Sequence, residues 1–344
     1  MSTTPVTPPS VTPDAIFQLA TGYMASKMLF AAGDIDLFAH LANGPLSSDA
    51  LAARMKLPER GVRIVADAMV ALSLLTLDAG PASAEASAGR RYRNSDVAQT
   101  FLSGKTPADM RPLLKFWDRL SYPAWQGLTD AVRRGGNDTA ALFTLSNEES
   151  AIFSAGVEAA TAGGAMALAE SYDFSRHARV LDIGGGTGSF LKFVQRRHPH
   201  IKGTLLEMPT TAAYARSRFT PDEAKSIAVV EGDILADAMP PGHDAMILAH
   251  ILHGFNEAQN AGLLQRASAA APAGGRLLIV DFFLDPTRTS PVMPALMSGE
   301  FLVQTMGRSY SAAEVSGWLN ETGWRYLEHR PLAGPVSLVI GEKS

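Results

Sequence analysis

The second half of the chain alternates short apolar runs with amphipathic segments, the pattern of parallel strands joined by helices. The apolar runs, typical of strands buried on both faces, lie at residues 178–184, 202–209, 226–233, 244–252 and 274–284. Segments with helical spacing lie at residues 188–199, 210–219, 256–271 and 311–324, and a final strand pair at 324–343. This alternation predicts an α/β fold, a doubly wound and mostly parallel sheet with helices on both faces. Ligands of such sheets bind beyond the carboxyl ends of the strands.

The first half of the chain has helical periodicity instead. Ile16, Leu19 and Tyr23 recur at three- and four-residue steps, and residues 45–77 predict a helix, a turn and a second helix. The apolar face of that second helix consists of Val62, Val65, Met69 and Leu72. Residues 77–95 are rich in Gly, Ala and Ser with β-prone ends, which predicts the wing of a winged-helix unit.

A winged helix can bind DNA, so a DNA-binding regulator is one hypothesis. The second helix carries Arg60 and Arg63, but Glu59 and Asp67 interrupt the basic stripe that phosphate contacts require. We therefore favour packing and dimerisation as the role of this half, with a second copy of the chain as the partner.

These patterns divide the chain into four expected segments. They are a disordered tail at residues 1–13, a mainly α winged-helix-like dimerisation domain at 14–147, a linker helix at 148–172, and a cofactor-binding catalytic domain at 173–344. The tail is rich in Pro and Thr, and it lacks the basic start and apolar core of a signal peptide.

Composition narrows the possible partners. A chain of 344 residues with 46% hydrophobic and 19% charged residues suits two globular domains. The net charge of −4 gives no general attraction for nucleic acid or anionic membrane. No apolar run reaches the roughly 18 residues of a membrane span. The chain has no cysteine, and no His, Asp or Glu pair has convincing ligand spacing. We expect a cytoplasmic protein without metal, membrane or nucleic-acid partners.

A glycine cluster in the sequence RVLDIGGGTGSF follows the first strand. Gly184, Gly186 and Gly188 permit positive φ and let a ligand approach bare main chain. A dinucleotide uses such a loop for its pyrophosphate, whereas S-adenosylmethionine brings a sulfonium and an ammonium group. Asp182 would repel a pyrophosphate and attract these cations. The motif therefore favours S-adenosylmethionine, and a nicotinamide-dependent oxidoreductase is a remote alternative.

Two further acids follow the next strands. Glu207 ends the second strand, where a ribose diol is bound in either cofactor class. Asp233 ends the third strand, where it could accept a hydrogen bond from the adenine amino group while Ile234 packs on the ring. Three acids at three successive strand ends predict one nucleoside-binding edge.

Over nearly its whole length the sequence resembles the class I S-adenosylmethionine-dependent O-methyltransferases of the caffeate and hydroxyneurosporene type, which include bacterial enzymes of antibiotic and pigment biosynthesis. The matching features are the helical first half, LDIGGGTG, the acid after the second strand, EGDI, and LHGFNEAQ. The resemblance implies a homodimer with a Rossmann-like catalytic domain. It also implies a small acceptor, aromatic or polyketide-like, that is methylated on a hydroxyl.

Methyl transfer to a phenol, whose pKa is about 10, requires positioning of the acceptor and removal of its proton. His253 follows the fourth strand, just before a helix that Asn256 and Gln259 can begin as a capping box. The resemblance places the family's catalytic base at His253 and the base-orienting carboxylate at Asp281, where glutamate is commoner. His250 is expected in the wall of the cofactor pocket.

The sequence departs from the family pattern at two places. Gly254 and Phe255 replace an Asp-Trp pair, and Ser309 stands where a second orienting glutamate is expected after a Gly-Arg pair. C- or N-methylation, or a member that no longer transfers methyl groups, are therefore alternative hypotheses.

We expect the acceptor pocket between the strand ends and two helices, at residues 147–160 and 295–307. Its candidate walls are Phe153, Met297, Phe301 and Met306. Met and Phe at helical spacing are also typical of a plain core; as walls of a wide, apolar pocket they would favour an aromatic or polyketide-like acceptor.

Overall fold

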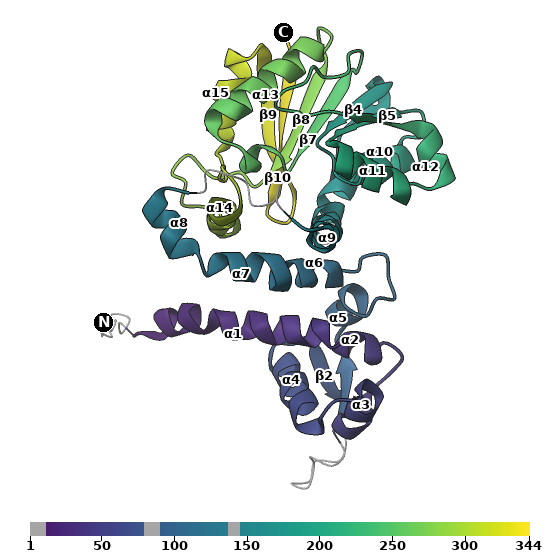
Figure 1. The fold of residues 1–344 in the computed structure, drawn as a ribbon, viewed down its shortest axis with the longest axis vertical. Helices are drawn as coiled ribbons and strands as arrows, with labels where there is room; N and C mark the ends of the chain where they lie inside the picture. Colours follow the sequence, from purple (N-terminus) through teal and green to yellow (C-terminus); the bar gives the residue numbers. More distant parts are fainter. Residues whose placement is uncertain (1–11, 79–89, 137–144) are drawn as a thin grey trace, which may run out of the picture. The chain divides into compact units, whose positions relative to one another are not determined.

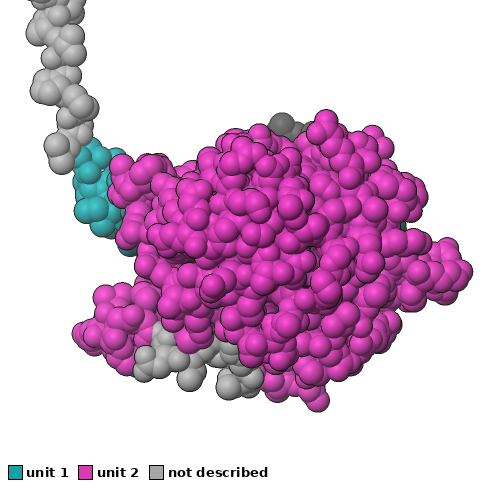
Figure 2. Space-filling view, turned by 90° about the horizontal axis from the view of Figure 1, so that it is seen from above, with its two compact units in different colours: residues 1–118 teal, residues 119–344 magenta. Residues whose placement is uncertain are grey.

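The computed structural model describes residues 12–78, 90–136 and 145–344, which form two compact units (Figure 1). Figure 2 colours the first unit, residues 1–118, and the second, residues 119–344. The boundary between the units lies inside the segment 14–147 that the sequence assigns to the first domain. Residues 1–11 of the expected tail and 79–89 of the expected wing lie outside the described residues.

The first unit consists of helices around a small antiparallel sheet. Its helices are α1 (Asp14–Asp34), α2 (Leu37–His40), α3 (Ser48–Met55), α4 (Glu59–Ala71), α5 (Asp96–Phe101) and α6 (Arg111–Phe116). Its strands are β1 (Leu46–Ser47), β2 (Leu75–Asp78) and β3 (Arg91–Asn94), in the order β1-β3-β2. β2 and β3 coincide with the two β-prone ends of the expected wing.

Helix α4 is amphipathic, and its buried face corrects one prediction. Val62, Ala66 and Met69 are buried because steps of three and four residues place them on one side of the helix. The prediction is right for Val62 and Met69 but wrong for Leu72, which is 42% exposed. Leu72 is the C-cap, one residue beyond the last helical residue, so the helical spacing no longer places its side chain.

The second unit is an α/β domain. A π-helical turn at Trp117–Ser121 leads into α7 (Tyr122–Trp125), α8 (Leu128–Arg134) and α9 (Asn147–Ser171). The strands that follow are β4 (Arg179–Ile183), β5 (Lys202–Glu207), β6 (Ile227–Glu231), β7 (Ala245–Ala249), β8 (Arg276–Asp281), β9 (Trp324–Ala333) and β10 (Val336–Lys343). The helices between them are α10 (Ser189–Arg197), α11 (Pro209–Arg218), α12 (Pro221–Ser226), α13 (Glu257–Ala270), α14 (Val292–Gln304) and α15 (Ala312–Glu321).

The predicted α/β fold with a mostly parallel sheet is confirmed. Each of the strands β4 to β8 begins later and ends earlier than its apolar run, or does one of these. The seven strands have the order β6-β5-β4-β7-β8-β10-β9. Strands β4 to β8 are parallel to one another, and β10 pairs antiparallel with both β8 and β9. The Asn256–Gln259 capping box is present at the start of α13. Helix α12 was missed, although Thr220 and Glu223 form another such box at its start.

Alternate residues of each central strand enter two separate cores. In β4, Val180 belongs to the core beneath α9, α10 and α11, whereas Leu181 and Ile183 belong to the core beneath α13 and α15. Because side chains of a strand point alternately to opposite faces, a continuous apolar run is needed to fill both cores. Helices on both faces leave the strand ends as the place for a ligand.

Within the described residues, one helix, α9, is long and apolar enough to cross a membrane by length and composition alone. It packs against α10 and β9 and buries a run of small and apolar residues that includes Ala165 and Leu168.

Candidate active site

The strand order reverses between β4 and β7, and the glycine loop lies at that point. From β4 the chain moves outward through β5 and β6, then returns to β7 on the other side of β4. The N–H of Gly184 donates to the Leu206 carbonyl at 2.8 Å, and the N–H of Gly186 donates to Glu207 Oε1 at 2.9 Å. The loop is therefore attached to β5 at the position where such sheets bind ligands.

All three predicted loop glycines, Gly184, Gly186 and Gly188, have positive φ, and Gly185 has no room for a side chain. Gly186 has φ of 60°, which disfavours other residues, and open space where a Cβ would stand. A Cβ on Gly185 would lie 2.2 Å from Asp182 Oδ2. The carboxylate of Asp182 therefore lies directly against bare main chain.

Asp182 is a buried acid with a strongly raised pKa. It is completely buried in β4, and neither of its oxygens has a hydrogen-bond partner among the described residues. Burial, and then the nearby charge of Glu207, raise the pKa of Asp182 to about 8. A buried carboxylate without a partner is costly, and a cation beside it would relieve that cost. This orphaned acid fits the cationic end of S-adenosylmethionine and does not fit a pyrophosphate.

The other predicted nucleoside contacts lie around the same loop. Glu207 is buried, its Oε2 accepts the N–H of Met208 at 2.8 Å, and burial raises its pKa. Asp233 follows β6 and is partly exposed, with Oδ1 accepting the N–H of Leu235 at 2.8 Å. Ile234 Cδ1 lies 3.5 Å from the position of a Cβ on Gly184. The structure thus brings Asp182, Glu207 and Ile234 together beside the glycine loop.

His253 and Asp281 form a hydrogen-bonded dyad. His253 lies in a 3-10 turn, Leu252–Gly254, after β7, and Asp281 is the last residue of β8. His253 Nδ1 is 2.6 Å from Asp281 Oδ1, and the backbone N–H of Phe282 donates to the same oxygen at 2.8 Å. Burial alone would raise the pKa of Asp281, but His253 and the hydrogen bonds hold that pKa below its usual value. Asp281 is therefore ionised, and His253 Nε2 is the ring nitrogen that remains for other chemistry.

The ring of Phe301, from α14, covers the imidazole of His253. The ring centroids are 3.9 Å apart and the planes are inclined by 7°. Phe301, which the sequence predicts as one of four walls of the acceptor pocket, is thus packed on the imidazole of the dyad. Phe153 on α9, Met297 on α14 and Met306 after α14 are partly buried.

His250 is a strained and neutral neighbour of the dyad. It has φ of 58° and its ring centroid is 6.0 Å from that of His253. Burial lowers the pKa of His250 to about 4, and its Nε2 has no partner within the described residues. The ligand atoms of His250, His253 and Asp281 lie within 4.8 Å of one another, a grouping that could hold a metal and that sequence spacing did not reveal.

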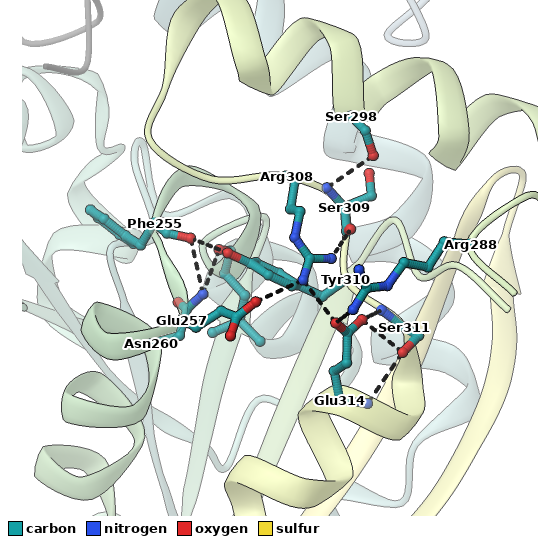
Figure 3. Close-up of polar contacts among 11 residues, drawn as sticks. Phe255, Glu257, Asn260, Arg288, Ser298, Arg308, Ser309, Tyr310, Ser311 and Glu314 are labelled. Carbon is teal, nitrogen blue, oxygen red and sulfur yellow. Dashed lines mark hydrogen bonds and ion pairs between the residues drawn. The ribbon is translucent and has the colours of Figure 1, made fainter. Parts of the chain in front are cut away.

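Figure 3 shows the polar contacts that the loop after α14 makes with residues that follow the turn of the dyad. The guanidinium of Arg308 lies 4.4 Å from the ring centroid of Tyr310 and donates at 2.8 Å to both Glu257 and Glu314. The Tyr310 hydroxyl donates to the Phe255 carbonyl at 2.6 Å. The sequence pattern did not predict these contacts, although the Gly-Arg pair marked the segment.

Two further positions of this loop bear on the dyad. Gly307 lies against the dyad turn, and Ser309 stands where a second acid is expected. A Cβ on Gly307 would lie 2.1 Å from the His253 carbonyl oxygen, so the loop passes directly over the turn. Ser309 is completely buried, and its hydroxyl has no partner among the residues that the structure describes. Its backbone N–H donates to Ser298 Oγ at 3.3 Å. A small hydroxyl therefore occupies the position where the family pattern has a second carboxylate.

Comparison with known proteins supports the same interpretation. Residues 125–325 match the model of the O-methyltransferase domain, and residues 17–104 match the O-methyltransferase dimerisation domain. The chain is 34% identical to 3-hydroxy-5-methyl-1-naphthoate 3-O-methyltransferase of Streptomyces sahachiroi, over 96% of each chain. It is 30% identical to the tetracenomycin polyketide synthesis 8-O-methyl transferase TcmO of Streptomyces glaucescens, over 96% of this chain and 97% of that protein.

A solved structure is similar to nearly the whole chain. Human N-acetylserotonin methyltransferase in complex with SAM superposes with a TM-score of 0.89 at 27% identity, covering 98% of this chain and 100% of that chain. The fold and the site define an enzyme that transfers methyl groups from S-adenosylmethionine. The chain belongs to the O-methyltransferase family, with its dimerisation domain in the first half.

Proposed function

We propose that this enzyme methylates a hydroxyl group of a small aromatic or polyketide-like metabolite, with His253 as general base and Asp281 as its orienting partner. The observation that carries the proposal is the 2.6 Å contact between His253 Nδ1 and the ionised Asp281. The chain's relatives include enzymes named for a naphthoate and for tetracenomycin, which favours a fused-ring acceptor.

The residues around the glycine loop fit the methyl donor. When bound, S-adenosylmethionine supplies a methyl group on a sulfonium that is already a good leaving group. Asp182 attracts the cationic methionyl end, and Glu207 accepts from the ribose hydroxyls. Asp233 and Ile234 hold the adenine. The loop glycines, Gly184, Gly186 and Gly188, allow close approach. His250 is neutral at physiological pH, so it does not repel the cation.

The dyad handles the proton of the acceptor. Asp281 keeps the imidazole proton on Nδ1 of His253, so Nε2 is a free acceptor for the hydroxyl proton. The negative charge of Asp281 stabilises the imidazolium that forms. Phe301 restricts rotation of the imidazole through its parallel ring. With Ser309 in place of a second carboxylate, Asp281 alone orients the base.

The acceptor lies against apolar side chains from two helices. Phe153, Met297, Phe301 and Met306 supply its walls. A hydroxyl that points at His253 Nε2 would have the rest of the ring system among these side chains. This arrangement would raise the rate of methyl transfer in two ways: it excludes water from the site, and it aligns the acceptor hydroxyl with His253.

We also propose a cytoplasmic homodimer formed through the first domain, residues 14–147. Helix α1 exposes large apolar side chains, Ile16, Phe17, Leu19, Tyr23 and Met24. Such a surface favours burial against a second copy of the chain. Residues 148–172 would then connect the dimerisation domain with the catalytic residues 173–344.

A binding and turnover experiment tests the function. Calorimetry should detect binding of S-adenosylhomocysteine and none of NADH, and labelled S-adenosylmethionine should transfer its methyl group to a naphthol. His253→Ala should lose transfer and keep S-adenosylhomocysteine binding. His200→Ala, at an exposed histidine, is the matched control and should behave as wild type. Unchanged turnover of His253→Ala would remove the base assignment.

A further inference from the structure

Helix α14 carries a buried carboxylate, Glu300, next to the residue that covers the dyad. Glu300 is 7% exposed and directly precedes Phe301, whose ring lies on His253. Residues 297, 300, 301 and 304 share one face of the helix, since residues three and four apart are neighbours. Glu300 therefore stands between two of the proposed acceptor walls.

Three donors surround the carboxylate of Glu300. The Ser121 hydroxyl donates to Oε2 at 2.7 Å, and the Trp125 indole N–H donates to the same oxygen. The Gln304 amide donates to Oε1. A carboxylate offers about four lone-pair positions, so one position on Oε1 remains open. Oε1 thus accepts one of these hydrogen bonds, whereas Oε2 accepts two.

No cation accompanies this acid. No Lys, Arg or His forms an ion pair with Glu300 within the described ranges. Burial raises the pKa of Glu300, whereas the three donors favour the ionised form. When Glu300 is ionised, its charge has no counter-ion among the described residues, and a second negative charge nearby would be strongly disfavoured.

The backbone around Glu300 is arranged to bring the donors close. Ser121 ends a π-helical turn, a rare element that is frequent at functional sites. Gly299 has no side chain, and a Cβ there would lie 2.8 Å from the Trp125 ring, so the indole packs directly on α14. This close packing holds the carboxylate in one place.

We propose that Glu300 determines acceptor specificity: it accepts a hydrogen bond from a second donor group of the acceptor and excludes acceptors that carry a carboxylate. This inference rests on the proposed function of the site. It names the substrate class as a neutral aromatic with two donors, one methylated at His253 and one held at Glu300. The relative that acts on a naphthoate would then differ from this enzyme in the charge of its acceptor.

Three matched acceptors test the proposal: a naphthol, a naphthalenediol with its second hydroxyl on the other ring, and a hydroxynaphthoate with a carboxylate in its place. We would measure kcat/KM for wild type and Glu300→Gln at about pH 8, because burial raises the pKa of Glu300 and an alkaline pH favours its ionised form. Wild type should prefer the diol and reject the hydroxynaphthoate. Glu300→Gln should lower the diol-to-hydroxynaphthoate ratio by about tenfold or more, equivalent to about 1.4 kcal/mol.

The controls separate folding, function and specificity. Glu321→Gln removes the same charge from an exposed site and should leave the ratio unchanged. Calorimetry with S-adenosylhomocysteine should show that both variants retain the cofactor site, and acceptor binding to these complexes should follow the same ratio. An equal ratio in wild type and Glu300→Gln, with turnover intact, would overturn the specificity role. If wild type neither binds nor methylates any of the three aromatics, the proposed acceptor class fails, and the inference fails with it.

Discussion

Replacing Asp182 by asparagine should make the ligand-free protein more stable than wild type, by an amount that grows as the pH rises. The same change should weaken binding of the cofactor. Asp182 has a pKa of about 8 in the folded protein and an ordinary value of 3.8. Between these values the folded state keeps a proton that the unfolded chain releases. Because the folded state binds this additional proton, the contribution of Asp182 to the free energy of unfolding falls with increasing pH in this window and is constant on either side of it.

The magnitude follows from proton linkage. One proton of difference changes the free energy of unfolding by about 1.4 kcal/mol per pH unit. Asparagine cannot ionise, so Asp182→Asn removes this slope. From about pH 5 to pH 7, wild type should lose about 3 kcal/mol of stability relative to the variant. The sign is opposite to that of Asp281, whose pKa is held below its usual value.

Urea unfolding followed by tryptophan fluorescence can measure this difference at each pH. Saturating S-adenosylhomocysteine should reverse the order of stability, because its ammonium compensates the carboxylate in wild type only. Parallel pH profiles of wild type and Asp182→Asn, without ligand, would refute the reasoning. So would equal affinity of the two proteins for S-adenosylhomocysteine.

Three further changes have expected outcomes. Asp281→Asn should lower kcat by about 100-fold or more, since the wrong tautomer of His253 is favoured, and calorimetry should find S-adenosylhomocysteine binding intact. Tyr310→Phe removes the 2.6 Å hydrogen bond to the Phe255 carbonyl and should cost about 1 kcal/mol in urea unfolding; an unchanged midpoint would contradict the fastening role of this loop. Leu19→Glu, at a side chain that is 85% exposed, should convert the proposed dimer to a monomer in light scattering, whereas a persistent dimer would place the interface elsewhere.

The local sequence determined most of the catalytic domain. The apolar runs that became β4 to β8 are long enough to fill two cores, and period-two alternation assigns their residues to opposite faces. The glycine loop could also be predicted from the sequence, because positive φ and close approach of a ligand to the main chain are properties of single glycine residues. Periodicity was insufficient for α12, which has only six residues, and for Leu72, which lies one residue beyond the end of α4.

Only the tertiary structure decided how the chemical groups are partnered. His253 and Asp281 are 28 positions apart, and Glu300 and Ser121 are 179 positions apart. The sequence named the first pair through resemblance, but it gave no sign of the second. Nor could it reveal that Asp182 is buried without a partner. Burial and hydrogen bonding depend on which distant elements pack together, whereas helix, strand and turn preferences are carried by neighbours along the chain.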